Sequence, residues 1–427
     1  MSRRYRAILA VAAAFMLVAA ACGDGGGDTG PTDVTAEGDF EGVEITFSTS
    51  LAQEEEAVLQ TLIDEFETDT GATVEIAAIT SADLPQRLKV DVGAGRNTIH
   101  LFAQDNLALR VLVDDELVED LSDVELPAEI LPELIPEEFD GVTYFLPYRP
   151  NVRVAYVNTE RFAAAGVEPP STHEEFREVA EALAAEGDGP KTTLSLEFPS
   201  GAAGVTISEW IVSFGGEPLI LNDEGSVAAF EFLQDMWQDD LFARESLQAK
   251  FDTEIDNLTG EVAWFAQNWP FTTATLADQG VLENFEVYEG WEGPERAAHV
   301  IGGEVLGVPK GVTGKEFDAA VGLAQFLMSQ DAQELLAAEN AWPSVRSDAY
   351  GEVPEEQQST FDAINGALEN GWYRPNVAYW ADVQEAINTA VTRVIVDGDP
   401  AKATLDELHD DIAAAADRAG ETYPPEG

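Results

Sequence analysis

The chain has 427 residues, and its 45% hydrophobic and 9% aromatic content allows two or three domains that each bury a core. Its 81 acidic residues against 22 basic ones give a formal net charge of −59, which repels phosphate backbones and so disfavours nucleic-acid binding. The acids are spread along the whole chain, and we expect a solvated acidic surface, as in proteins adapted to high salt. The alternative is that they steer a cationic ligand.

The N-terminus predicts a secretory leader. Residues 2–6 carry three arginines, and residues 7–21 form an apolar run that is shorter than the roughly 20 residues of a membrane-spanning helix. The only cysteine, Cys22, follows three alanines, which resembles the lipobox of bacterial lipoproteins, although Ala19 stands where Leu is usual. We expect residues 1–21 to be a lipoprotein signal peptide and residues 22–41 to be a flexible tether. The alternative is an ordinary signal-peptidase site with an incidental thiol.

Strands and helices then alternate. Segments rich in β-branched residues predict strands at residues 43–48, 73–79 and 99–103. Apolar residues at helical spacing predict the intervening helices, at residues 53–67 and 84–92. This βαβαβ order predicts a parallel sheet covered by helices, whose ligands bind beyond the carboxyl ends of the strands. Residues 50–55 and 104–106 are therefore candidate site positions.

Residues 139–176 connect one packed body to another. Residues 144–146 and 152–157 have the composition of strands, but Pro147 and Pro150 between them lack the backbone donors of a central ladder. Tyr148, Arg149 and Asn151 stand among these prolines and can make directional contacts to a polar ligand. The alternative is a strand–turn–strand within a single sheet.

The rest of the chain continues the α/β pattern. Further strands are predicted at residues 193–198 and 299–308, and residues 263–266 lead into the segment 267–271. Further helices are predicted at residues 173–183, 207–214, 227–241, 317–327, 332–340, 383–394 and 401–416. Asp399 and Pro400 are the predicted N-cap and first residue of the last helix. Gly302 and Gly303 permit close backbone approach and mark a second candidate crossover.

Six blocks stand in an order that is typical of one protein family. They are IDEFETDTGATVEI from Ile63, LPY with VNTERFAAAGVEPPSTHEEF to Phe176, NWP from Asn268, GGEVLGVPKG from Gly302, FLMSQDAQELLAAENAWPSV from Phe326 and YRPNVAYW from Tyr373. Together they resemble the family 1 extracellular solute-binding proteins of ABC importers, in particular the maltose and trehalose branch. The resemblance covers about residues 43–416.

This resemblance implies the type II periplasmic-binding-protein fold, an α/β fold of two lobes that are joined by a hinge of strands and close on a solute. It implies one lobe of residues 42–148 and 300–342, and another of residues 149–299 and 343–427. It further implies a monomer without metal or cofactor, lipid-anchored at Cys22 on the extracytoplasmic face of the membrane. Such a protein captures a carbohydrate and delivers it to the permease subunits of the importer.

In that branch, acids and arginines hold sugar hydroxyls, and aromatic rings cover the apolar sugar faces. The matching positions here are Glu55, Arg87, Asp105, Tyr148, Trp269 and Arg374. Three further ligand-binding candidates are Gly303, Glu304 and Arg149. Glu304 follows Gly303 where the branch often has an aromatic residue, and Arg149 begins an altered polar run. We expect a neutral di- or oligosaccharide, with a uronate or a polyol as alternatives. Each of these residues also has a structural alternative, as a core aromatic or as one partner of an ion pair.

An enzyme is the main rival class. The four histidines are scattered without metal-ligand spacing, and the chain has neither a G-x-S-x-G elbow nor a phosphate-binding loop. A glycoside hydrolase remains an alternative at this point, because 81 acids offer many chance carboxylate pairs. A surface adhesin without a buried site is a third class.

Overall fold

The computed structural model describes residues 38–424, apart from residues 50, 52, 82, 107, 108, 188, 341, 351, 352 and 354–356. The predicted signal peptide, Cys22 and the predicted tether up to residue 37 lie outside the described residues. Among the helices of the described part, none is both long enough and apolar enough to cross a membrane.

The first sheet begins with the predicted βαβαβ unit. Its strands are β1 (Glu44–Thr49), β2 (Thr73–Ala78), β3 (Leu101–Asp105), β4 (Leu146–Val152), β8 (His299–Gly307) and β9 (Gly371–Tyr373). The order is β2-β1-β3-β8-β4, and β9 pairs with β8. Strand β1 is parallel to β2 and β3, which confirms the predicted parallel start, whereas β8 is antiparallel to β3 and β4.

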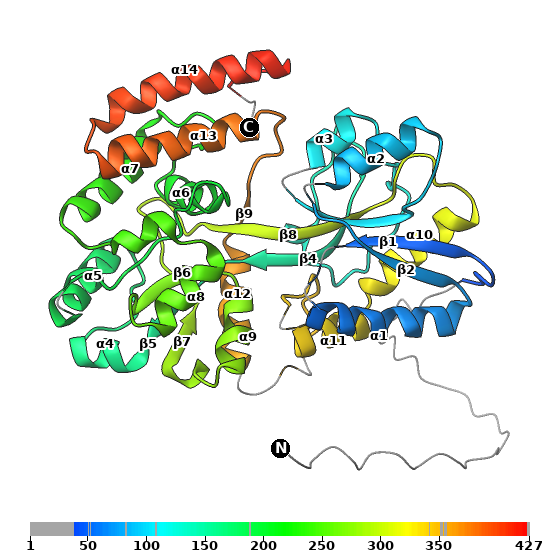
Figure 1. Cartoon of the computed structure of the whole chain (residues 1–427), viewed down its shortest axis with the longest axis horizontal. Coiled ribbons are helices and arrows are strands. Elements are labelled where there is room, and N and C mark those ends of the chain that lie inside the picture. The colour runs from blue at the N-terminus through cyan, green and yellow to red at the C-terminus, as the bar shows by residue number, and fades with distance from the viewer. Residues whose placement is uncertain are drawn as a thin grey trace, which may run out of the picture. The chain divides into compact units, whose positions relative to one another are not determined.

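Helices cover both faces of this sheet (Figure 1). α1 (Gln53–Thr70), α10 (Lys315–Leu327) and α11 (Gln330–Asn340) pack over one face, where Phe47, Phe66 and Phe326 belong to one apolar cluster. α2 (Leu84–Gly93) and α3 (Leu109–Asp114) lie over the other face and bury Leu88 and Leu112. The predicted helices at residues 53–67, 84–92, 317–327 and 332–340 are confirmed, whereas α3 was not predicted.

The second sheet is antiparallel, with the order β6-β5-β7. Its strands are β5 (Val154–Asn158), β6 (Phe265–Asn268) and β7 (Phe285–Tyr288). Its helices are α4 (Thr159–Ala165), α5 (His173–Gly187), α6 (Ala202–Ser213), α7 (Glu224–Gln238), α8 (Phe251–Thr259), α9 (Phe271–Asp278), α12 (Gln358–Glu369), α13 (Trp380–Ala390) with a π-helical extension (Val391–Val396), and α14 (Ala401–Ala419). Short 3₁₀ turns occur at Pro132–Leu134, Arg244–Gln248 and Leu282–Asn284. Strand β4 leads into β5 across the single residue Arg153.

The structure corrects the prediction of a break at the two prolines. Pro147 and Pro150 lie inside β4, which is an edge strand that pairs with β8 alone. An edge strand tolerates proline because one side of its backbone has no ladder to make. The register also shifts between Pro147 and Arg149, which relieves the missing donors locally.

Two smaller predictions are wrong. Residues 193–198 do not form a strand, because the backbone amides of Leu194 and Leu196 bond to Ser246 in a 3₁₀ turn rather than to a neighbouring strand. Pro400 is the N-cap residue of α14 rather than its first residue. Asp399 does not cap that helix, since its carboxylate pairs with Arg393 Nε at 3.1 Å.

Candidate functional site

Three charged residues form a row across neighbouring strands of the first sheet. Asp105 is the last residue of β3 and lies opposite Glu304 on β8, and Glu304 lies opposite Arg149 on β4. Cross-strand partners have Cβ atoms about 5 Å apart, so the sheet register itself brings these side chains together. The row lies at the carboxyl end of β3, which is where the α/β pattern predicts a ligand.

Arg149 is the centre of this row. Its guanidinium lies 3.1 Å from the Glu304 carboxylate and 3.3 Å from that of Glu55, measured between the nearest N and O atoms. The guanidinium carbon also lies 4.4 Å from the ring centroid of Trp342, a cation–π distance. The Trp342 indole donates a 2.8 Å hydrogen bond from Nε1 to Glu55. We call these four residues, Glu55, Arg149, Glu304 and Trp342, the arginine cluster.

The backbone under the arginine cluster requires a glycine. Gly303 has φ of +96°, and a Cβ atom there would lie 2.0 Å from the carbonyl oxygen of Arg149. Only glycine fits such a position, so β8 can approach β4 closely enough for Glu304 to meet Arg149. Tyr148, the preceding residue of β4, is buried, with its ring edge-to-face against Phe47 and Trp342.

The acids of the cluster interact electrostatically. Burial raises the pKa of Glu304; Arg149 offsets part of this effect, whereas the carboxylates of Asp105 and Glu55 add to it. Burial likewise raises the pKa of the Tyr148 hydroxyl. The Tyr148 hydroxyl can donate and accept hydrogen bonds, and the carboxylates can accept them, which suits contacts to hydroxyl groups.

Arg374 lies in a separate cavity of 170 Å³, on the segment that follows β9. The cavity is also lined by Asn106, Glu137, Val305 and Asn376, so it joins residues of the first sheet to the 373–376 segment. Arg374 is 8% exposed, and its Nε has no hydrogen-bond partner among the described residues. Burial lowers the pKa of Arg374, while the carboxylates of Asp105 and Glu209 oppose that shift. A buried guanidinium donor of this kind can hold an acceptor oxygen of a bound solute.

The remaining two predicted residues lie apart from the arginine cluster. Trp269 is 8% exposed and packs against Phe251, Val205 and Val300, and a Cβ atom at Gly302 would lie 2.8 Å from its ring. Arg87 pairs with Asp91 and Thr98, both at 2.9 Å, before β3 begins, whereas Asp105 is at the other end of that strand. The structure thus brings six of the nine predicted residues together, with Arg374 in the adjoining cavity, and leaves out Arg87 and Trp269.

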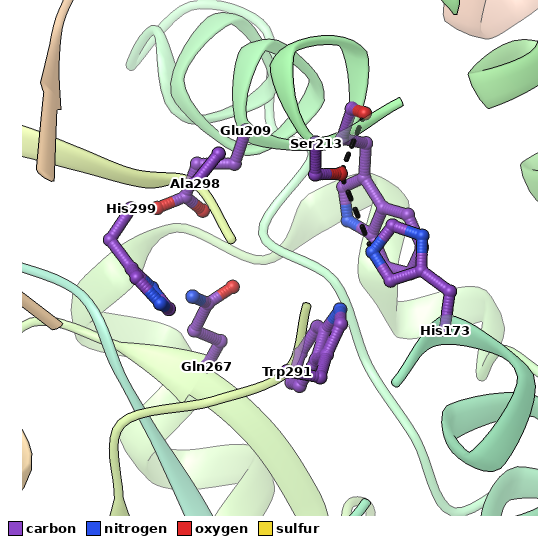
Figure 2. A pocket seen from close by; sticks show the side chains of 8 residues that line it. His173, Glu209, Ser213, Gln267, Trp291, Ala298 and His299 are labelled. Carbon is purple, nitrogen blue, oxygen red and sulfur yellow. Dashed lines mark hydrogen bonds between the residues drawn. The ribbon is translucent and has the colours of Figure 1, made fainter. Parts of the chain in front are cut away.

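A second cavity, drawn in Figure 2, lies between α5, α6, β6 and the start of β8. It is lined by His173, Glu209, Trp210, Ser213, Gln267, Trp291, Ala298 and His299, and its volume is 10 Å³. That volume holds about one water molecule, so it is too small for an organic solute. Burial lowers the pKa of His173 to about 3 and that of His299 to about 4, so both rings are neutral at pH 7.

Sequence reasoning did not identify Trp342, Glu137 or Asn376. The sequence predicted only a helix at residues 332–340, just before Trp342, because the approach of Trp342 to Arg149 joins positions that are almost 200 residues apart. Residues 104–106, at the end of β3, were candidate site positions. Asn106 donates from Nδ2 to the Ile301 carbonyl at 3.3 Å. Within the described residues, no group of three or more His, Cys, Asp or Glu side chains could hold a metal ion.

Comparison with known proteins places this geometry in a family. A family described as bacterial extracellular solute-binding proteins matches residues 61–360. No curated protein matches the chain. Among solved structures, the sugar-binding protein MalE of the phytopathogen Xanthomonas citri has a TM-score of 0.77 at 17% identity and covers 90% of this chain and 100% of its own.

Two further solved structures are similar to this chain, with slightly lower TM-scores. Maltose-bound MalE3 of T. maritima has a TM-score of 0.73 at 20% identity and covers 87% of this chain and 99% of its own. An ABC transporter solute-binding protein of Agrobacterium radiobacter K84, in complex with ribitol, has a TM-score of 0.71 at 18% identity and covers 88% of this chain and 99% of its own. At these identities the likeness shows a shared fold, the α/β periplasmic-binding-protein fold.

Proposed function

This chain belongs to the family of bacterial extracellular solute-binding proteins, and we propose that the solute it captures is a carbohydrate, a di- or oligosaccharide. Its role is that of a binding protein of an ABC transporter and not that of an enzyme. The observation that carries the proposal is the arginine cluster, in which Arg149 contacts Glu55, Glu304 and the Trp342 ring at once.

The chemistry of the cluster matches the hydroxyl-rich surface that a sugar presents. Carboxylates accept hydrogen bonds from sugar hydroxyls, and a guanidinium donates to hydroxyl and ring oxygens. The Trp342 ring is buried behind the Arg149 guanidinium, which it holds in place. Maltose and ribitol in two of the similar structures support a polyhydroxylated solute here.

The balance of charge favours a neutral solute over a uronate. Three carboxylates lie near Arg149, those of Glu55, Asp105 and Glu304. The carboxylates of Glu55 and Asp105 repel that of Glu304 and raise its pKa. An added carboxylate on the solute would increase this repulsion. A neutral sugar can use the same acids as hydrogen-bond acceptors.

A small polyol is the second candidate. The cavity at Arg374 has a volume of 170 Å³, which is below the roughly 300–1,000 Å³ typical of pockets for drug-sized ligands. A single ring or a linear polyol would fill it, whereas a disaccharide would extend from it toward the arginine cluster. The lengths of the solutes that bind distinguish the two candidates.

Our proposal includes the two predicted lobes, 42–148 with 300–342 and 149–299 with 343–427, closing over the solute. The arginine cluster, carried mainly by the first group of segments, and Arg374 with Trp269, carried by the second, would then contact the same molecule. The proposed partner is the permease of the importer. Lipidation at Cys22 would hold the receptor at the extracytoplasmic face of the membrane, and we propose that it is a monomer.

Thermal-shift screening of the purified protein against sugars, uronates and polyols tests this function. A solute that binds only the folded state stabilises it by about 2.7 kcal/mol at a hundred times its dissociation constant, which raises the melting temperature. We expect neutral di- or oligosaccharides to give the largest shift without being hydrolysed. Shifts from uronates alone, or hydrolysis of a bound sugar, would contradict the proposal.

A further inference from the structure

Trp342 belongs to a segment whose own anchoring is unusual. Between α11 and α12, residues 342–350 form a turn that we call the connector. It begins beside Arg149 and Glu55, and almost all of its side chains near the start are buried: Trp342, Ser344, Val345 and Arg346 are each at most 6% exposed. Such a buried stretch of irregular backbone needs partners for its polar groups.

One side-chain amide supplies two of these partners. Gln333 on α11 is 2% exposed, and its Oε1 accepts from Ser344 Oγ and from the backbone amide of Val345, both at 3.0 Å. Its Nε2 donates to the carbonyl of Leu327 at 2.8 Å and to that of Tyr148 at 3.4 Å. Gln333 therefore bonds both to the connector and to β4, the two segments that carry Trp342 and Arg149.

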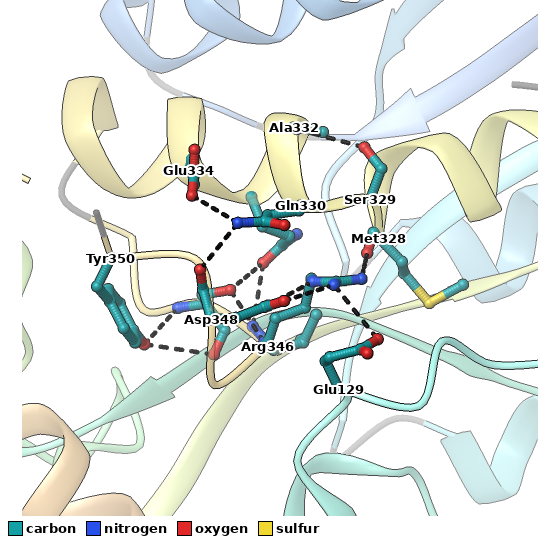
Figure 3. A network of polar contacts seen from close by, with 12 residues as sticks. Glu129, Met328, Ser329, Gln330, Ala332, Glu334, Arg346, Asp348 and Tyr350 are labelled. Carbon is teal, nitrogen blue, oxygen red and sulfur yellow. Dashed lines mark hydrogen bonds and ion pairs between the residues drawn. The ribbon is translucent and has the colours of Figure 1, made fainter. Parts of the chain in front are cut away.

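The far end of the connector is fixed separately, by Arg346 (Figure 3). Its guanidinium contacts the Asp348 carboxylate at 2.8 Å, the Glu129 carboxylate at 3.4 Å and the Met328 carbonyl at 3.3 Å. Gln330 also donates to the carbonyl of Asp348 at 3.3 Å. Near the start of the connector, the backbone amide of Trp342 donates to the Leu336 carbonyl at 3.3 Å and that of Ser344 to the Tyr350 hydroxyl at 2.9 Å. The amide of Gln333 adds the hydrogen bond that ties this part of the connector to β4.

We propose that Gln333 is a positioning residue for solute binding, because its amide sets the placement of the Trp342 ring against Arg149 and Glu55. The solute part of this inference rests on the proposed function, in which the arginine cluster contacts the solute. Replacing the amide by an apolar group of similar size leaves the Ser344 hydroxyl and the Val345 backbone amide without their acceptor. It also leaves the backbone carbonyl of Tyr148 without its donor. Since unpaired buried polar groups are costly, the connector then shifts to find other partners.

The test compares Gln333→Met with Gln234→Met. Gln234 is a matched control because its Nε2 also donates to two backbone carbonyls, those of Val394 at 2.7 Å and Asp399 at 2.9 Å, far from the arginine cluster in sequence and contacts. The first readout needs no solute: it is the indole N–H resonance of Trp342 in protein labelled with ¹⁵N-tryptophan, assigned by its loss in Trp342→Phe. The second readout is the affinity for the sugar found by screening.

We expect Gln333→Met to move the Trp342 resonance and to weaken sugar binding about tenfold, whereas Gln234→Met leaves both at wild-type values even if it lowers the melting temperature. An unmoved resonance in Gln333→Met, or equal changes in the control, would overturn the proposal. If no sugar binds the wild-type protein, the proposed function fails while the resonance still decides the positioning role. Should Gln333→Met not fold, Ser344→Ala removes one bond to the amide, and it must move the same resonance.

Discussion

Arg149 and Arg153 are only four residues apart, yet they lie in opposite surroundings. The Arg153 side chain is 1% exposed, and it contacts Glu209 at 2.5 Å, Thr206 at 3.1 Å and the Gln267 carbonyl at 2.9 Å. The Arg149 side chain is 22% exposed, with carboxylates at 3.1 and 3.3 Å and a tryptophan ring beside it. Arg153 has short bonds to groups of its own chain, whereas Arg149 has longer ones and remains open to solvent.

This difference separates an arginine that holds the fold from one that is available to a solute. Glu209 also accepts from the backbone amide of Val300 at 2.9 Å, so the Arg153 pair ties β8 to α6 and β6. The Nε of Arg153 has no hydrogen-bond partner among the described residues, but a side chain that is 1% exposed lies out of reach of a solute. The guanidinium of Arg149 is partly exposed and stacks on a ring, so it can replace bound water by sugar oxygens at a small cost in free energy.

The largest predicted effect is on stability at Arg153. Arg153→Met leaves Glu209 buried without its cation, which should lower the free energy of unfolding by about 3–5 kcal/mol at neutral pH. Arg149→Met should lower it by only about 1 kcal/mol, because that pair is partly solvated. Urea unfolding of both variants measures the two losses in unfolding free energy. Equal losses would show that the two arginines do not differ in role.

The next effect is a loss of stability in acid that is caused by two buried histidines, His173 and His299. The pKa values of His173 and His299 are about 3 and about 4 in the folded protein, against about 6.5 in the unfolded chain. As pH falls below 6.5, the unfolded chain binds protons that the folded protein does not. The resulting loss of stability continues down to about pH 4 for His299 and about pH 3 for His173. Above pH 6.5 they contribute no pH dependence.

Buried acids oppose this trend, since burial raises the folded pKa values of Glu209 and Glu304 and the folded protein takes up their protons first. The histidine contribution is therefore isolated by difference. Unfolding free energies of wild type and of the His173→Gln, His299→Gln double variant, measured from pH 8 to pH 4.5, should converge as pH falls. Parallel curves would contradict neutral buried histidines.

The smallest effect is expected at Arg87, the predicted site residue that lies away from the arginine cluster. Its side chain is 49% exposed, and its partner Asp91 keeps a second cation, Arg96, at 3.2 Å. Arg87→Gln should change the unfolding free energy by less than about 1 kcal/mol and leave solute affinity unchanged. A loss of affinity in a calorimetric titration would bring Arg87 back into the site.

Much of the fold was predictable because the signals were local. The apolar spacing of α1 and the β-branched runs of β1 to β3 are confirmed, and Gly303 marked a close backbone approach. The break predicted at the prolines of β4 was wrong, because β4 is an edge strand, and edge strands tolerate proline. The position of a strand within its sheet is decided only when the sheet assembles. Asp105, Arg149 and Glu304 could be proposed together through strand ends and family resemblance. Trp342 and Gln333 could not, since irregular backbone between two helices has no periodic signal.

The central claim is that the arginine cluster binds a neutral sugar, and calorimetric titration of Arg149→Lys tests it most directly. Lysine keeps the charge but loses the planar fork and the stacking on Trp342, so we predict an affinity about tenfold below wild type. Wild-type affinity itself should barely change between low and high salt, because a neutral solute adds no charge to be screened. Unchanged affinity in Arg149→Lys, or a wild-type affinity that falls steeply with salt, would contradict the account.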